Sequence, residues 1–223
     1  MPRAARIVYP NLAVHITQRG NNRGKCFFSE SDHLAYLRFL HQFAPEADCA
    51  VHAYCLMPNH VHLLLTPRSR EGCAVLMKRL GQHYVQHVNR VQGRTGTLWE
   101  GRFWSAVCAS ERYVLACYRY IELNPIRAKL ASAPDAYLWS SYHANALGKD
   151  DSLLVLHESY LALADEPERR RKAYRGLFAW ALDDRDLDEI RSASRSGRPM
   201  GAERKVRGRP ALGDRPRFSQ CDK

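Results

Sequence analysis

The chain has 223 residues, of which 45% are hydrophobic and 26% are charged, which is enough for one compact domain with its own core and an appendage. Its 34 lysines and arginines outnumber its 23 acidic residues and give a formal charge of +11, which favours a polyanionic partner, with nucleic acid as the leading candidate. No apolar run reaches the roughly 18 to 20 residues that span a bilayer, and the N-terminus lacks the apolar segment of a signal peptide, so we expect a cytoplasmic protein with no membrane partner.

The first part of the chain predicts a strand, a helix and a hairpin. Residues 12–18 are rich in β-branched side chains and end at the Gly and Asn cluster RGNNRGK, which indicates a strand followed by a turn or an exposed basic loop. From Ser31, a Ser or Asp cap precedes apolar positions that lie on one helical stripe. Residues 49–56 and 61–66 are apolar runs separated by MPN, which predicts two paired strands with a tight connection.

The central part adds a helix, a strand and another helix. Residues 71–92 carry apolar side chains at helical spacing, and residues 98–109 are aromatic and β-branched enough for a strand or a tight two-stranded element. Ser110 and Glu111 open a helix that we expect to stop at Pro125, because proline cannot continue the backbone hydrogen bonds. This order indicates an α+β fold of the ferredoxin-like type, an antiparallel sheet with two helices on one face and a third helix after the last strand.

The composition changes beyond residue 135. Apolar and aromatic segments up to residue 190 predict a small helical extension, whereas Arg, Gly, Pro and Ser dominate from Arg191 onward. Such a segment cannot bury enough apolar surface to order itself, so we expect a flexible basic tail that either keeps the protein soluble or contacts phosphates. The chain therefore divides into a main domain (1–135), a helical extension (136–190) and a flexible basic tail (191–223).

The seven cysteines are scattered, form no CxxC pair and are odd in number. In a reducing compartment such cysteines are small core residues or free thiols. A zinc finger and a disulfide scaffold are therefore excluded.

Two histidines, His60 and His62, stand one residue apart within the apolar run MPNHVHLLL. On a strand both side chains point to the same face, while that of Val61 points to the other. Two neutral imidazoles side by side suit a divalent ion such as Mn²⁺, or Mg²⁺ if oxygen ligands and waters complete the shell. The alternative is that both histidines merely line a polar face of the sheet.

A second pair of polar residues, Tyr120 and Asn124, is four residues apart and shares one face of the last predicted helix of the main domain. If that helix crosses the open face of the sheet, Asn124 could supply a third metal ligand and Tyr120 could act as a nucleophile beside the ion. The alternative for Tyr120 is a packed aromatic side chain. Tyr118 lies roughly 200° around the helix from Tyr120, and we assign it to packing.

Arginines and lysines surround these motifs. A phenol is mostly protonated at neutral pH, so a tyrosine nucleophile needs cationic neighbours. Backbone phosphates would in turn need a basic rim, although surface charge alone would look similar. The candidates for the first role are Arg102, Arg119 and Arg127, and those for the second are Arg19, Arg23, Lys25, Arg94 and Arg102.

Three aromatic residues near the predicted strand 98–109 could stack unpaired bases or belong to the core. They are Trp99, Phe103 and Trp104. Alternation along a strand predicts that Phe103 points inward if Trp104 points outward.

Three motifs, YCLMPNHVHLLL, LWEGRFW and YRYIELNPIRA, occur in this order and together resemble the REP-associated tyrosine transposases, which are relatives of the single-strand insertion-sequence transposases in the HUH endonuclease superfamily. The resemblance covers about residues 8–145. It implies a metal-dependent (Mg²⁺ or Mn²⁺) endonuclease that cleaves and rejoins single-stranded DNA beside hairpins of palindromic repeats.

The resemblance also implies roles for individual residues. It places the histidine pair of the family on His60 and His62 and the catalytic tyrosine on Tyr120. Asn124 takes the place of the third ligand, where insertion-sequence relatives tend to have glutamine. The implied product is a 5′-phosphotyrosine with a free 3′-hydroxyl, made by a monomer or a homodimer.

Two other functions remain open at this point. One is a non-catalytic nucleic-acid-binding module that uses a ferredoxin-like sheet, but the central strand carries His60 and His62 where such a module would have stacking rings. The other is a metal-dependent RNA nuclease or toxin.

Overall fold

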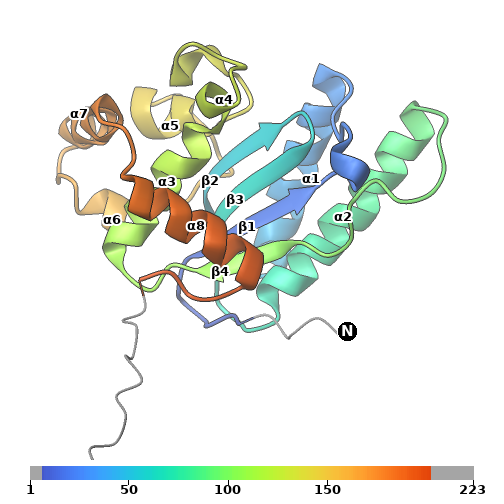
Figure 1. Cartoon of the computed structure of the whole chain (residues 1–223), viewed down its shortest axis with the longest axis horizontal. Coiled ribbons are helices and arrows are strands. Elements are labelled where there is room, and N and C mark those ends of the chain that lie inside the picture. The colour runs from blue at the N-terminus through green and yellow to red at the C-terminus, as the bar shows by residue number, and fades with distance from the viewer. Residues whose placement is uncertain (1–6, 202–223) are drawn as a thin grey trace, which may run out of the picture.

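A four-stranded antiparallel sheet in the order β2-β3-β1-β4 forms the centre of the computed structural model, which describes residues 7–201 (Figure 1). The strands are β1 (Val14–Arg19), β2 (Cys49–Met57), β3 (His60–Pro67) and β4 (Trp104–Val107). Helices connect β1 to β2 and β3 to β4, and a short turn connects β2 to β3. This topology is the predicted ferredoxin-like arrangement.

Two helices, α1 (Glu30–Glu46) and α2 (Gly72–Val91), cover one face of the sheet. The Asp32 carboxylate accepts hydrogen bonds from the backbone N–H groups of Phe28 and Ser29, at 2.9 and 3.1 Å, which caps the start of α1. In α2 the predicted apolar stripe is buried against α1 and the sheet. This side of the sheet is therefore a closed core.

The other face of the sheet carries α3 (Glu111–Glu122) and α8 (Asp184–Ser196). The prediction that the first of these helices continues to Pro125 is wrong, because α3 ends at Glu122 and a short helix, α4 (Asn124–Arg127), follows. Pro125 lies in the first turn of α4, where its missing N–H removes no hydrogen bond. The third predicted helix thus lies on the second face of the sheet, where α8 joins it, and helices cover both faces.

The predicted strand 98–109 is shorter in the structure. Only Trp104–Val107 pairs with β1 as a strand, whereas Trp99 makes an isolated bridge to Gly20. Gly101 lies between these two regions with φ +104°, a left-handed conformation that interrupts an extended strand. A short 3₁₀ turn, η1 (Asn21–Arg23), follows β1 and faces this irregular segment.

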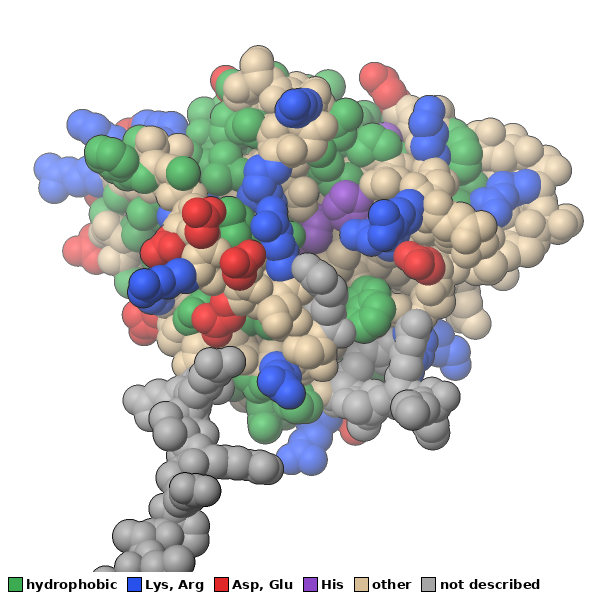
Figure 2. Space-filling view, in the orientation of Figure 1, with side chains coloured by type: hydrophobic (Ala, Val, Ile, Leu, Met, Phe, Trp, Pro, Cys, Tyr) green, Lys and Arg blue, Asp and Glu red, His purple; other side chains and the backbone are tan. Residues whose placement is uncertain are grey.

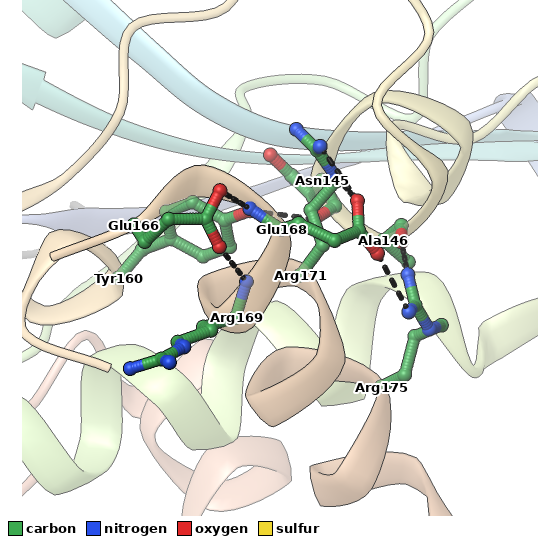
Figure 3. A network of polar contacts seen from close by, with 8 residues as sticks. All are labelled: Asn145, Ala146, Tyr160, Glu166, Glu168, Arg169, Arg171 and Arg175. Carbon is green, nitrogen blue, oxygen red and sulfur yellow. Dashed lines mark hydrogen bonds and ion pairs between the residues drawn. The ribbon is translucent and has the colours of Figure 1, made fainter. Parts of the chain in front are cut away.

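Short helices follow α4. They are η2 (Pro134–Ala136), α5 (Tyr142–Leu147), α6 (Glu158–Leu161), α7 (Pro167–Gly176) and η3 (Leu177–Ala179). Three of them, α5, α6 and α7, contact α3 through Asn145, Tyr160 and Tyr174. Polar contacts between α5, α6 and α7 hold this bundle together, as Figure 3 shows. The Tyr160 hydroxyl donates to the Asn145 carbonyl oxygen at 2.7 Å, and Arg175 donates to the Ala146 carbonyl oxygen.

The segment after Arg191 differs from the expected flexible tail as far as it is described. The expected boundary at residue 190 falls inside α8, where Ile190 and Ala193 are buried. Beyond the helix, the Met200 backbone N–H donates to the Val107 carbonyl oxygen at 2.7 Å, next to the end of β4. Residues 191–201 are therefore ordered by the packing of α8 and by backbone pairing at Met200, which composition does not reveal. The rest of the predicted tail, residues 202–223, lies outside the described residues.

The six cysteines among the described residues are buried and not joined in disulfides, in agreement with the predicted core thiols, and Cys221 lies outside the described residues. Within residues 7–201, no helix has both the length and the apolar composition needed to cross a membrane.

Candidate active site

A cavity of about 780 Å³ opens on the face of the sheet that carries α3 and α8. Figure 2 shows histidine side chains at the surface of this region, between groups of lysine and arginine side chains. The cavity is lined by Thr17, Arg19, Arg23, Asn59, His60, His62, Glu100, Trp104, Tyr120, Asn124, Arg191 and Ser194. Five separate parts of the chain thus meet at one place.

The two predicted histidines lie on this cavity because β3 begins at His60 and its side chains alternate between the faces. Across the ladder between β1 and β3, His60 is opposite Arg19 and His62 is opposite Thr17. The two imidazole ring centroids are 4.9 Å apart, with ring planes at 84°. Val61, between them, is fully buried in the core on the other face.

Each histidine is oriented through its Nδ1 atom. His60 Nδ1 lies 2.6 Å from Asn59 Oδ1, while His62 Nδ1 lies 2.9 Å from His15 Nε2 and 3.1 Å from Thr17 Oγ1. Within the described part of the chain, no residue makes a hydrogen bond to Nε2 of His60 or His62. The Nε2 atoms are therefore the ring nitrogens available to a ligand.

Burial keeps these rings neutral. It lowers the pKa of His60 to about 4, with a smaller contribution from the positive charge of Arg19. Burial also lowers the pKa of His62 well below its usual range, and nearby His60, His15 and Arg127 lower it further. A neutral imidazole presents a lone pair, which is the form that binds a metal ion.

Asn124 lies at the start of α4 and lines the same cavity. One atom of its amide, Nδ2, is buried and has no hydrogen-bond partner among residues 7–201. A half-turn of the amide would place Oδ1 there, and an amide oxygen is a ligand for hard divalent ions. Three or more His, Cys, Asp or Glu side chains do not gather into a metal-binding group anywhere in the described chain. The predicted groups at this cavity that could hold a divalent ion are two imidazoles and one amide.

Tyr120 faces the histidines from α3. Its ring meets the His62 ring edge-on, with centroids 5.7 Å apart, and the His15 ring in the same manner at 5.6 Å. The Arg127 guanidinium lies over the Tyr120 ring, 4.2 Å from its centroid, and donates to the Tyr120 carbonyl oxygen at 2.5 Å. Tyr118 is fully buried on another side of the helix, as predicted.

The seven predicted basic residues are not all at the cavity. Arg19 and Arg23 line it, and Arg127 contacts Tyr120. Arg119 instead donates to the Trp180 carbonyl oxygen at 2.5 Å, and Arg94 donates to the Thr97 carbonyl oxygen at 2.9 Å. Lys25 and Arg102 are exposed and do not line the cavity.

The aromatic side chains near β4 follow the predicted alternation. Phe103 is buried in the core, whereas Trp104 is 39% exposed and lines the cavity. Trp99 also belongs to the core.

Sequence reasoning missed five residues that line the cavity, Thr17, Asn59, Glu100, Arg191 and Ser194, and also His15, which contacts His62 Nδ1. Alternation along the predicted strand 12–18 places His15 and Thr17 on one face, which was a usable signal. Arg191 and Ser194 gave no signal, because their segment has the composition of a disordered tail.

Comparisons with known proteins agree with this arrangement. A family model described as "Transposase IS200 like" matches residues 8–124. A provisionally named REP-associated tyrosine transposase of Haemophilus influenzae is 24% identical over 101 residues. The match covers 41% of this chain and 57% of that protein, so this chain spans little more than half the length of that relative. The solved structure of a REP-associated tyrosine transposase bound to a REP hairpin has the same fold, with a TM-score of 0.57 and 14% identity over 70% of this chain and 99% of that one.

Proposed function

The chain belongs to the IS200-like transposase family, and from that membership we propose that it cleaves and rejoins single-stranded DNA beside hairpins through a 5′-phosphotyrosine on Tyr120. The observation that carries the proposal is the meeting of a strand and a helix at one cavity. His60 and His62 come from β3 and Tyr120 comes from α3, and the Tyr120 and His62 rings are 5.7 Å apart. A tyrosine hydroxyl beside two neutral imidazoles that can bind a metal ion suits metal-assisted phosphoryl transfer.

In the proposed reaction the Tyr120 oxygen forms a bond to the phosphorus of the scissile linkage. The bond from phosphorus to the 3′-oxygen breaks, and that oxygen leaves with a proton as a free 3′-hydroxyl, while the phenol proton passes to water. A divalent ion such as Mg²⁺ or Mn²⁺, held by His60, His62 and Asn124, would stabilise negative charge on the phosphate oxygens. The phosphotyrosine bond keeps the DNA end available for rejoining to another 3′-hydroxyl.

Arg127 has a specific task in this scheme. Its guanidinium lies 4.2 Å from the centroid of the Tyr120 ring, where it supports the negative charge that develops on the phenol as its proton leaves. Because Arg127 also holds the Tyr120 carbonyl oxygen, it fixes the backbone of the nucleophile. Arg119, one residue from Tyr120, makes its contact with the Trp180 backbone instead.

DNA contacts follow from the cavity rim. Arg19 and Arg23 line the cavity and would contact backbone phosphates of the bound strand. The half-exposed Trp104 indole lies in the same row of the sheet as Thr17 and His62 and offers a surface on which an unpaired base can stack. The REP hairpin bound by the structurally similar transposase supports hairpin DNA as the substrate class.

The test uses single-stranded oligonucleotides that contain palindromic repeats, Mn²⁺ and a denaturing gel. We expect a covalent adduct of protein and DNA that disappears with Tyr120→Phe and after removal of the metal with EDTA. Tyr118→Phe is the matched control, because Tyr118 is buried in the same helix, away from the cavity, and should leave the adduct unchanged. Tight binding without any adduct would instead support the non-catalytic module, and an adduct that persists in Tyr120→Phe would refute the assigned nucleophile.

A further inference from the structure

A row of hydrogen-bonded side chains lies behind His62, on the side away from its Nε2 atom. His15 Nε2 is 2.9 Å from His62 Nδ1, and Ser194 Oγ is 3.3 Å from His15 Nδ1. The His15 and His62 rings are stacked, with centroids 5.1 Å apart and an angle of 19° between their planes. His15 is 1% exposed, so water does not replace these contacts.

We propose that His15, supported by Ser194, is a positioning residue that holds His62 in the tautomer with its proton on Nδ1 and its lone pair on Nε2. This inference rests on the proposed function, in which His62 binds a divalent ion through Nε2. It adds residues of β1 and α8, namely His15 and Ser194, to a site that otherwise consists of the histidine pair, Tyr120 and Asn124. His15 itself does not touch the metal or the DNA.

The argument follows from the number of protons. A neutral imidazole has one N–H, so only one of the two facing nitrogens, His62 Nδ1 and His15 Nε2, can donate in their hydrogen bond. If His15 Nδ1 carries its proton and donates to Ser194 Oγ, His15 Nε2 is an acceptor. His62 then donates from Nδ1 to His15 Nε2, with the Thr17 hydroxyl oxygen, 3.1 Å from the same atom, as a second acceptor, which leaves the Nε2 lone pair of His62 available. The opposite arrangement would put the proton of His62 on Nε2 and block a metal ion.

Ser194 can act in this way because its helix is held in place. The Met200 backbone N–H donates to the Val107 carbonyl oxygen at 2.7 Å, and the Ala109 N–H donates to the Met200 carbonyl oxygen at 2.8 Å. This pairing fixes the end of α8 against β4, next to β1. The Tyr120 ring also meets His15 edge-on at 5.6 Å, so one buried ring touches both a ligand and the nucleophile.

The test compares three variants in the full chain. His15→Phe keeps a ring for stacking but removes the acceptor, whereas His15→Gln places an amide oxygen near the position of Nε2 and restores an acceptor. Ser194→Ala removes the far end of the row. Two readings are taken: the protonated nitrogen of His62, from ¹⁵N NMR of the imidazole in metal-free protein, and the Mn²⁺ affinity, from calorimetry.

We expect the wild-type His62 to carry its proton on Nδ1. His15→Phe should shift the proton toward Nε2 and weaken Mn²⁺ binding by about 10- to 100-fold, the size of effect that second partners of metal-bound histidines have. His15→Gln should restore most of the affinity, and Ser194→Ala should have a smaller effect than His15→Phe.

Two results would overturn the inference: a wild-type His62 protonated on Nε2, or an unchanged tautomer and Mn²⁺ affinity in His15→Phe. The wild-type measurement decides even if His15→Phe does not fold. It is also independent of DNA cleavage. A wild-type protein with the expected tautomer and Mn²⁺ binding but without a DNA adduct would refute the proposed function and leave the role of His15 supported.

Discussion

Replacing Glu122 by glutamine should change how the stability of the protein depends on pH. Glu122 is fully buried at the end of α3. Its Oε1 atom accepts hydrogen bonds from Ser141 Oγ at 2.6 Å and Asn145 Nδ2 at 2.8 Å, and its Oε2 atom accepts from the Tyr174 hydroxyl at 2.6 Å. Burial raises the pKa of Glu122 to about 7, although the three hydrogen bonds act in the opposite direction.

The magnitude follows from the difference between the folded and unfolded pKa values. The usual value is 4.5 and the folded value is about 7, which at about 1.4 kcal/mol per pKa unit corresponds to about 3 kcal/mol. Because the folded pKa is the higher one, the folded protein binds the proton more tightly than the unfolded chain does. The stabilisation that protonated Glu122 contributes is therefore fully present below the unfolded pKa of 4.5 and is lost as the pH rises to the folded pKa of about 7.

The assay is urea unfolding of wild type and Glu122→Gln at several values between about pH 5 and pH 8. Glutamine cannot ionise, and its amide keeps an acceptor for Ser141 and Asn145 while the Tyr174 hydroxyl turns to accept from the new N–H group. As the pH rises from about 5 to 8, we expect the free energy of unfolding of the variant to increase by about 2 to 3 kcal/mol relative to that of wild type.

Wild type and Glu122→Gln must be compared with each other, because buried histidines make the stability of both proteins rise with pH, opposite to the effect of Glu122. Burial lowers the pKa of His52 to about 4, so the unfolded chain binds its proton more tightly and stability rises as the pH increases toward the usual value. That contribution is common to both proteins and cancels in the difference. Glu111→Gln, exposed in the first turn of α3, controls for removing one negative charge from the same helix. A difference between wild type and Glu122→Gln that stays flat with pH would refute the reasoning.

Two further changes test how the site is built. A side chain at Gly20 would collide with the carbonyl oxygen of Gly24 and displace the turn that carries Arg23, so Gly20→Ala should weaken hairpin binding in a gel-shift assay. Gly176→Ala is the control, because Gly176 has open space around it, and it should bind as wild type does. Equal binding by both variants would show that the turn is dispensable. The planar guanidinium of Arg127 contacts both the ring and the carbonyl oxygen of Tyr120. The ammonium group of a lysine cannot make both contacts, so Arg127→Lys should slow adduct formation by about 10- to 100-fold. An unchanged rate would remove Arg127 from the mechanism.

Local periodicity carried most of the correct predictions. The alternation along one strand placed both His60 and His62 on the same face, and the helical spacing separated Tyr120 from Tyr118. The position of Asn124 was correct for a different reason from the one expected. The helix breaks at Leu123, and Asn124 reaches the cavity as the first residue of α4.

Features that depend on contacts between distant segments were not visible in the sequence. Ser194 belongs to a helix with few apolar residues, and its place in the fold depends on backbone pairing of Met200 with β4. His15 could be placed on a face of its strand, but its contact with His62 requires the register between β1 and β3. Composition also suggested a tail at Arg191, because a short helix with only two buried apolar side chains, Ile190 and Ala193, has almost the same composition as a disordered segment.

The end of α3 connects the extension to the cavity. Tyr120 and Glu122 are two residues apart and therefore point to different sides of the helix, one toward the histidines and the other into α5 and α7. The three hydrogen bonds to Glu122 fix the last turn of α3 from one side, and Arg127 fixes it from the other through the Tyr120 carbonyl oxygen. A helix turn held at both sides cannot rotate without breaking buried hydrogen bonds, each of which costs about 1 to 3 kcal/mol when one partner is left unpaired. Helices α5 and α7 therefore help to hold the proposed nucleophile in position, although they contribute no side chain to the cavity.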